Sequence, residues 1–235
     1  MDYERDTKNA YQDKEKAKAY LEQYTKGTKW ARFTMWRQRA LIKKILGRCN
    51  LTRSDWVLDL PCGTGFIGEV LVDCPACVIA SDISIEMMGL ARSEYDENRF
   101  RGFVQADITE TPFTKGSFSC VVVLALMHRL HESLRRDVLS EVASLSSKYV
   151  IMSYSVESRS QRIKQRVLRA LSSSHLPAPS AVPLSDILRE VASHGFTVRS
   201  ISHIVYFLSA KVVLLLEKND QRDSCVSSDS RSQLG

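Results

Sequence analysis

Residues 57–71, VLDLPCGTGFIGEVL, decide the fold that this sequence predicts. An apolar run of strand length, 56–60, leads into a turn, 61–65, that contains Gly63 and Gly65. A helix is indicated next, because apolar residues recur at helical spacing at Phe66, Ile67, Val70 and Leu71. A strand, a glycine turn and a helix in this order form the place where α/β proteins bind a nucleotide-like ligand, since glycine lets the backbone approach closely.

Two acidic residues strengthen this interpretation. Asp59 lies at the carboxyl end of the first predicted strand, and Asp82, 23 residues further on, follows the apolar run 78–80. Dinucleotide-binding folds place a carboxylate on ribose hydroxyls at about this offset. A dinucleotide site requires G-x-G-x-x-G around a pyrophosphate, and a phosphate loop requires a lysine followed by Ser or Thr. The chain offers P-C-G-T-G-F-I-G and no such lysine, so a pyrophosphate is the less favoured ligand.

Four segments resemble, in order, the motifs of the class I S-adenosylmethionine (SAM) methyltransferases. DLPCGTG at 59–65 resembles their first motif, D/E-x-G-x-G-x-G, with Pro61 in place of the first glycine. SDIS at 81–84 resembles the ribose-binding strand end, and QADITETPF at 105–113 resembles the segment where an Asp meets the adenine amino group. FSCVVVLALMH at 118–128 resembles the fourth strand. The resemblance covers roughly residues 50–155.

This resemblance implies both a fold and a cofactor. The fold is a doubly wound, Rossmann-like α/β sheet of seven mostly parallel strands, with a C-terminal antiparallel hairpin and helices on both faces. The cofactor is SAM, whose amino-acid end would be held by Asp59 and the 63–65 backbone, its ribose by Asp82 and its adenine amine by Asp107. The expected cofactor-binding residues are Asp59, Pro61, Gly63, Gly65, Asp82, Ile83, Asp107 and Ile108, with both isoleucines packing against the adenine.

The methyl acceptor is expected beyond the fourth strand. Amino-N methylases of DNA and glutamine carry an acid or Asn followed by Pro-Pro and an aromatic there, whereas this chain reads ALMHR at 125–129. His128 is the candidate general base for a hydroxyl, and a histidine packed at the mouth of a helix is the equally weighted alternative. Arg129, His131 and Tyr20 are weaker candidates for substrate binding, and Arg129 has the alternative of pairing with a neighbouring acid.

Length and composition predict one domain with additions. The chain has 235 residues, 44% of them hydrophobic, and no apolar run approaches membrane-span length. Together with a charged N-terminus, this predicts a cytoplasmic protein. The expected parts are N-terminal helices covering the cleft at 1–50, the SAM-binding core at 51–155, a basic lid at 156–183, the rest of the core sheet at 184–217 and a disordered tail at 218–235.

The six cysteines predict free thiols rather than a disulfide framework, because no secretory signal is present. Cys74 and Cys77 have the spacing of a zinc-binding pair. No second Cys or His pair follows at the usual distance, so we expect no metal site.

Net charge and patterning rank the possible acceptors. A net charge of +6 is spread over helices predicted at 30–46 and 160–171, without an evident RNA-binding module. We expect methylation of an O or N atom on a small-molecule or lipid- or saccharide-linked acceptor, with an anionic substrate or a membrane surface as possible partners. The alternatives are an RNA methyltransferase and a non-catalytic SAM-binding regulatory or scaffold protein.

Overall fold

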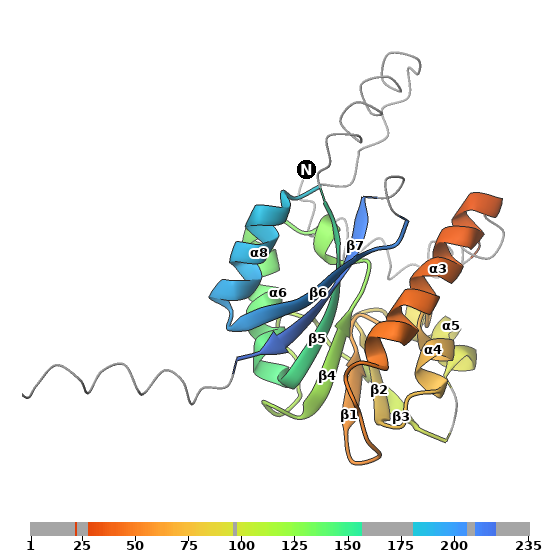
Figure 1. The fold of residues 1–235 in the computed structure, drawn as a ribbon. Coiled ribbons are helices and arrows are strands. Elements are labelled where there is room, and N and C mark those ends of the chain that lie inside the picture. The colour runs from red at the N-terminus through yellow and green to blue at the C-terminus, as the bar shows by residue number, and fades with distance from the viewer. Residues whose placement is uncertain (1–21, 23–27, 96–97, 157–180, 206–209, 220–235) are drawn as a thin grey trace, which may run out of the picture.

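The structure is a computed structural model, and it describes residues 22, 28–95, 98–156, 181–205 and 210–219. Its centre is a seven-stranded sheet with the strand order β3-β2-β1-β4-β5-β7-β6 (Figure 1). The strands are β1 (Trp56–Asp59), β2 (Cys77–Asp82), β3 (Phe100–Gln105), β4 (Phe118–Val123), β5 (Ser146–Ser155), β6 (Phe196–His203) and β7 (Lys211–Lys218).

The sheet is mostly parallel. Strands β1 to β5 pair in parallel, whereas β7 runs antiparallel to both of its neighbours, β5 and β6. Parallel strands require helical crossovers, which explains the alternation of strands and helices along the core of the sequence. The predicted Rossmann-like α/β fold with a C-terminal antiparallel hairpin is confirmed.

Helices cover both faces of the sheet. In Figure 1, α3 (Lys29–Leu46), α4 (Gly68–Val72) and α5 (Ile85–Ala91) lie on one side, and α6 (Glu132–Leu145) and α8 (Leu184–Ser193) on the other. Two short 3₁₀ helices follow α5 and β4: η1 (Arg92–Glu94) and η2 (Met127–Arg129). α5 begins after Ser84, a residue type favoured at N-caps, and the Ser84 hydroxyl accepts the N–H of Met87 at 3.1 Å.

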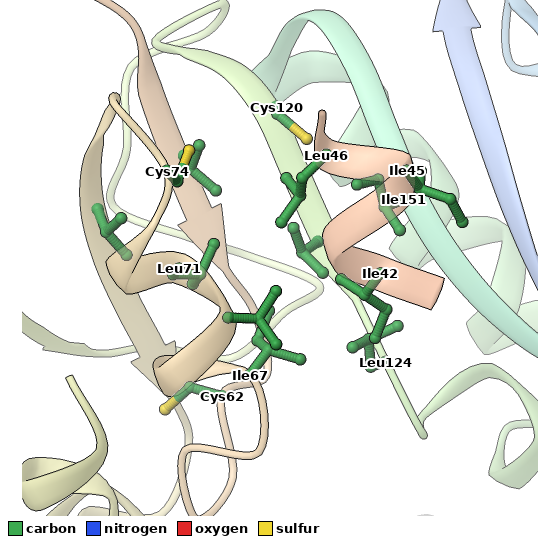
Figure 2. Close-up of a cluster of buried hydrophobic side chains, with 14 of the residues drawn as sticks. Ile42, Ile45, Leu46, Cys62, Ile67, Leu71, Cys74, Cys120, Leu124 and Ile151 are labelled. Atoms are coloured by element: carbon green, nitrogen blue, oxygen red, sulfur yellow. The ribbon is translucent and has the colours of Figure 1, made fainter. Parts of the chain in front are cut away.

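Two apolar clusters, one on each face, hold these layers together. Cys120 and Val122 of β4 belong to the first cluster, and Val121 and Val123 belong to the second, as the two-residue period of a strand requires. Figure 2 shows the first cluster, in which side chains of α3 and α4 gather over the sheet. A strand such as β4 is therefore buried on both faces, and its uninterrupted apolar sequence follows from that position.

Three details differ from the prediction. The apolar run 120–126 predicts a strand that continues to residue 126, but β4 ends at Val123, because Ala125 has φ 56° and extended backbone cannot pass through it. α4 begins only at Gly68, so that Phe66 and Ile67 lie in the turn before it. The apolar pattern of residues 30–46 predicts that Ala40 lies on the buried face of this helix, whereas Ala40 of α3 is exposed.

Several expected parts lie mainly or wholly outside the described residues. They are the charged segment 13–26, whose apolar spacing predicts a helix, the basic helix at 160–171 and the tail at 218–235. The two ends of the expected lid at 156–183 are described, and Val156 and Val182 form a parallel bridge there. Of the helices in the described parts of the chain, none is both long and apolar enough to cross a membrane.

Candidate functional site

The predicted site residues gather at one edge of the sheet. Asp59 and Asp82 end β1 and β2, while Asp107 and Ala125 each follow the last residue of β3 or β4 by two positions. The parallel strands all present their carboxyl ends at this edge. The strand order reverses between β1 and β4, and open α/β sheets bind ligands at such a switch point.

Asp82 holds the glycine turn in place. Its Oδ2 accepts the backbone N–H of Gly63 at 2.8 Å, and its Oδ1 accepts that of Ser84 at 2.9 Å. Burial raises the pKa of this carboxyl, and the N–H groups of Ser84 and Gly63 act against that shift. Because a carboxylate has about four acceptor positions, Asp82 can bind hydroxyls while it keeps both backbone contacts.

Asp59 is a second buried carboxyl on this edge, with 2% of its surface exposed. The Tyr95 hydroxyl donates a hydrogen bond to its Oδ2 at 2.6 Å. Burial raises the pKa of Asp59 to about 7, the hydrogen bond from Tyr95 lowers it, and the nearby Asp82 raises it. A buried acid with a raised pKa favours a cationic ligand, whose charge restores the ionised form.

An aromatic cluster orients the Tyr95 hydroxyl. The Tyr95 ring stacks on Phe100 with centroids 4.7 Å apart and meets Phe103 edge-on at 5.6 Å. Such contacts fix the ring beyond what its burial alone would do. Tyr95 is thus a positioning residue for Asp59 that the sequence reasoning missed.

The two glycines of the turn are needed for different reasons. Gly63 has φ 52° and nothing within 4 Å of the place where a Cβ would lie, so it is required by backbone conformation. Gly65 has φ 78°, and its Cβ would also come within 2.8 Å of the Glu94 Cβ. A third glycine, Gly68, would place a Cβ 2.3 Å from the Glu94 carbonyl oxygen. Close packing of the turn against η1 therefore depends on Gly65 and Gly68.

Most N–H groups of the turn are used internally. Cys62 donates to the Ser81 carbonyl at 2.8 Å, and the Gly65 N–H donates to the Cys62 carbonyl at 3.0 Å. Pro61 has no N–H to offer. Within the described chain, the Thr64 N–H has no acceptor, so Thr64 is the turn residue best suited to donate to a ligand.

The loop after β3 is also ordered by its acid. The Asp107 Oδ1 accepts both the N–H of Thr109, at 3.0 Å, and its hydroxyl, at 2.8 Å. Gln105 links this loop to the one after β2, because its Nε2 donates to the Ile83 carbonyl at 2.9 Å. Ile83 is half-buried, and Ile108 packs against the second apolar cluster. The loops that carry the predicted adenine-binding residues are therefore neighbours.

On the other side of the switch point, a strained turn follows β4. Ala125 adopts φ 56°, and the Ser153 hydroxyl of β5 accepts its N–H at 2.8 Å. Strained backbone of this kind is stable only when neighbouring residues hold its conformation, and it is found more often at functional sites than elsewhere. Ser153 thereby sets the course of the chain into η2, which contains His128 and Arg129.

Three basic side chains lie beside this turn, of which two are cationic at neutral pH. Burial and the positive charge of Lys211 lower the pKa of His128 to about 4. Loss of solvent and the charge of Arg129 in turn lower the pKa of Lys211, although the residue as a whole is exposed. Because β7 pairs with β5, Lys211 from the C-terminal hairpin reaches the same edge as η2. We call His128, Arg129 and Lys211 the basic edge.

The comparison with protein families decides the class of this site. Residues 57–148, which hold the glycine turn and the acids that end β1 and β2 and follow β3, match the family model described as "Methyltransferase domain". Residues 57–148 are a methyltransferase domain. The predicted methyltransferase family is confirmed for this part of the chain.

Solved structures share the fold of this methyltransferase. Magnesium protoporphyrin IX methyltransferase ChlM from Synechocystis PCC 6803, with bound SAH, is 15% identical over 92% of this chain and 100% of its own, with a TM-score of 0.73. A putative methyltransferase in complex with the Haloferax volcanii Trm112 activator is 14% identical over 91% of this chain and 97% of its own, with a TM-score of 0.64. No curated protein sequence matches significantly.

The residues of the methyltransferase fit its cofactor. SAM carries a positively charged amino group and ribose hydroxyls, and the site offers two buried carboxyls, Asp59 and Asp82, at adjacent strand ends. Gly63, Gly65 and Gly68 also satisfy the G-x-G-x-x-G spacing, so the glycines alone did not separate SAM from a dinucleotide. The family match makes that distinction.

The remaining predicted residues are less informative. His131 is exposed at the N-cap of α6, and Tyr20 lies outside the described residues. Cys74 is buried and Cys77 half-buried, and both are free thiols. No set of three or more His, Cys, Asp or Glu side chains in the described parts of the chain could hold a metal ion.

Proposed function

We propose that the methyltransferase acts on a small-molecule or lipid- or saccharide-linked acceptor that carries an anionic group next to the methylated O or N atom. The basic edge carries this proposal. Arg129 and Lys211 are close enough for the charge of one to lower the pKa of the other. A phosphate or carboxylate between them would relieve that repulsion, and the half-buried Arg129 guanidinium would interact strongly with such a group.

His128 is proposed as the group that takes the acceptor's proton. With a pKa of about 4 it is neutral at physiological pH, so a ring nitrogen can accept a proton. An anionic acceptor bound at Lys211 would offset the charge that lowers this pKa and make His128 a stronger base. In-line methyl transfer requires alignment above all, and the strained turn at Ala125 supports a fixed geometry for η2.

On the cofactor side, we propose roles by place in the fold. Asp59, with Pro61, Gly63 and Gly65, would hold the amino-acid end of SAM, Asp82 its ribose and Asp107 its adenine amine. Ile83 and Ile108 would pack against the adenine. Arg129 would contact the acceptor, with smaller roles for His131 and Tyr20. The cytoplasmic location stays a prediction.

The test is an assay for S-adenosylhomocysteine released from SAM. Candidate acceptors are small molecules and lipid- or saccharide-linked compounds with a phosphate or carboxylate, each paired with a neutral analogue. We expect turnover with an anionic compound and little with its analogue, and a loss of turnover in His128→Ala. RNA methylation that falls steeply with added salt would instead support the RNA alternative. SAM binding without turnover on any acceptor would support the scaffold alternative.

A further inference from the structure

The first two turns of α3 carry a row of exposed aromatic side chains. Trp30, Phe33 and Trp36 expose 49%, 43% and 61% of their surfaces. The ring centroids of Trp30 and Phe33 are 5.8 Å apart, and those of Phe33 and Trp36 are 6.1 Å apart. The three rings therefore form one continuous apolar strip and are not separate surface residues. Large aromatic side chains lose favourable burial when they face water, so such a strip indicates an interaction surface.

This strip points away from the rest of the protein. The buried residues of α3 are Gln38, Ile42, Ile45 and Leu46, all in its second half. At about 100° per residue, Phe33 and Trp36 lie on the opposite side of the helix. None of residues 29–37 is buried, and Figure 1 shows the red N-terminal half of α3 projecting beyond the sheet. Figure 2 shows the other half, where Ile42, Ile45 and Leu46 pack into the first apolar cluster.

The charge of α3 has a single sign. Its sequence, KWARFTMWRQRALIKKIL, contains lysines and arginines and no acid. Arg39 pairs with Glu69 at 2.8 Å, and Lys43 pairs with Asp73, which ties the C-terminal half to α4 and its following residue. Arg32 and Arg37 beside the aromatic strip are exposed, and neither forms an ion pair with any part of the chain that the structure describes. The projecting half of α3 is thus aromatic and cationic together.

We propose that this half of α3 docks on the surface of an anionic lipid bilayer. Helices that lie in the membrane interface combine Trp and Phe with Lys and Arg, the rings entering the headgroup region and the cations meeting acidic lipids. The absence of any acid from α3 suits a negatively charged surface. This inference goes beyond the reaction, since it concerns where the methyltransferase works, and it holds whatever the acceptor is.

Vesicle co-sedimentation of the full chain tests the proposal. We expect binding to phosphatidylcholine vesicles that contain phosphatidylglycerol, weaker binding to phosphatidylcholine alone, and a decrease with added salt. Replacing Trp30, Phe33 and Trp36 by Ser should weaken binding about a hundredfold. Arg32→Gln with Arg37→Gln should weaken it about tenfold. The matched control is Arg48→Gln with Arg53→Gln, two exposed arginines at the other end of α3 and beyond it, and should have little effect.

Tryptophan fluorescence locates the contact. The chain has three tryptophans, and two of them are Trp30 and Trp36. Anionic vesicles should shift the emission of the wild type to shorter wavelength. Trp30→Phe with Trp36→Phe should keep vesicle binding, because phenylalanine is also apolar, but should lose the shift, since only Trp56 remains. SAM binding by each variant, measured by calorimetry, shows that the fold is intact and separates this test from that of the acceptor.

Three outcomes would overturn the proposal. The first is no binding of the wild type to anionic vesicles. The second is a loss of binding in the Arg48 and Arg53 control as large as that in the Arg32 and Arg37 variant. Binding would then depend on the overall charge of the protein and not on α3. The third is a wild type that dimerises in sedimentation velocity and a serine variant that does not, with no vesicle binding by either protein. The partner of the aromatic strip would then be a second copy of this chain.

Discussion

The two sides of the switch point carry opposite charge. On the side of β1 and β2, buried carboxyls at Asp59 and Asp82 face the ligand edge, and burial raises the pKa of both. On the side of β4 and β7, Arg129 and Lys211 are cations, and the charge of Lys211 and burial keep the neighbouring His128 neutral by lowering its pKa to about 4. One sheet edge can therefore receive a cationic cofactor on one side and an anionic acceptor on the other.

Removal of the Asp82 carboxyl should have the largest effect. Asp82→Ala takes away the proposed ribose contact and leaves the N–H groups of Gly63 and Ser84 without their acceptor. Each unpaired N–H costs about 1–3 kcal/mol, so we expect SAM affinity to fall about a hundredfold or more. Calorimetric titration measures this. Asp73→Ala removes an exposed acid paired with Lys43 and is the control, and equal loss in both variants would contradict the role of Asp82.

SAM affinity should depend on the ionisation of Asp59. The pKa of its carboxyl is about 7, and a cation binds the ionised form, so affinity should fall about tenfold for each pH unit below 7. In Asp59→Asn we expect affinity about thirtyfold lower at high pH and without this pH dependence. Titrations across pH measure both. A wild-type affinity that is constant from about pH 5 to about pH 8 would contradict the assignment.

The same carboxyl should affect stability in the opposite direction. Because its pKa is raised on folding, its contribution to the stability of the ligand-free protein is fully present below its usual pKa of 3.8 and is lost as pH rises towards 7. In thermal unfolding experiments, Asp59→Asn should therefore lose less stability than the wild type as the pH rises from 3.8 to about 7. A wild type that becomes more stable relative to the variant over this range would show that the acid has a cationic partner in the ligand-free state.

Variants of the basic edge should affect the acceptor alone. Arg129→Gln with Lys211→Met should raise KM for an anionic acceptor about tenfold and leave KM for a neutral analogue nearly unchanged. Steady-state kinetics with both acceptors measure this. A matched pair of exposed cations on another part of the surface, Lys115→Met with Arg136→Gln, provides the control. Equal changes for the charged and neutral acceptors would exclude anion binding at this edge.

Removal of the Tyr95 hydroxyl should have the smallest effect. Tyr95→Phe keeps the ring contacts with Phe100 and Phe103 and removes the hydrogen bond that lowers the pKa of Asp59. The midpoint of the pH dependence should move up by about one unit, so that SAM affinity near neutral pH falls about fivefold. The same titrations detect this shift. A midpoint that moves down would mean that Tyr95 does not stabilise the ionised form.

The two sides also differ in how far the sequence predicts them. The spacing of residues along the sequence is enough to find the cofactor side, because a strand, a turn and a second strand contain Asp59, Gly63 and Asp82 in order. Lys211 reaches His128 only because β7 inserts beside β5, a long-range pairing that no local pattern encodes. The Tyr95 contact with Asp59 likewise depends on how η1 packs against the glycine turn. The contact of Ser153 could not be predicted for the same reason, since Ser153 lies in β5 and its partner Ala125 lies in the loop after β4.

The most direct test of the divided edge is a side-by-side titration with SAM. Wild type, Asp82→Ala and the double variant Arg129→Gln with Lys211→Met are compared by calorimetry at one pH. We expect Asp82→Ala to lose SAM binding and the double variant to bind SAM as the wild type does. Loss of SAM affinity in the double variant, with its fold intact by thermal unfolding, would contradict the division of the edge into a cofactor side and an acceptor side.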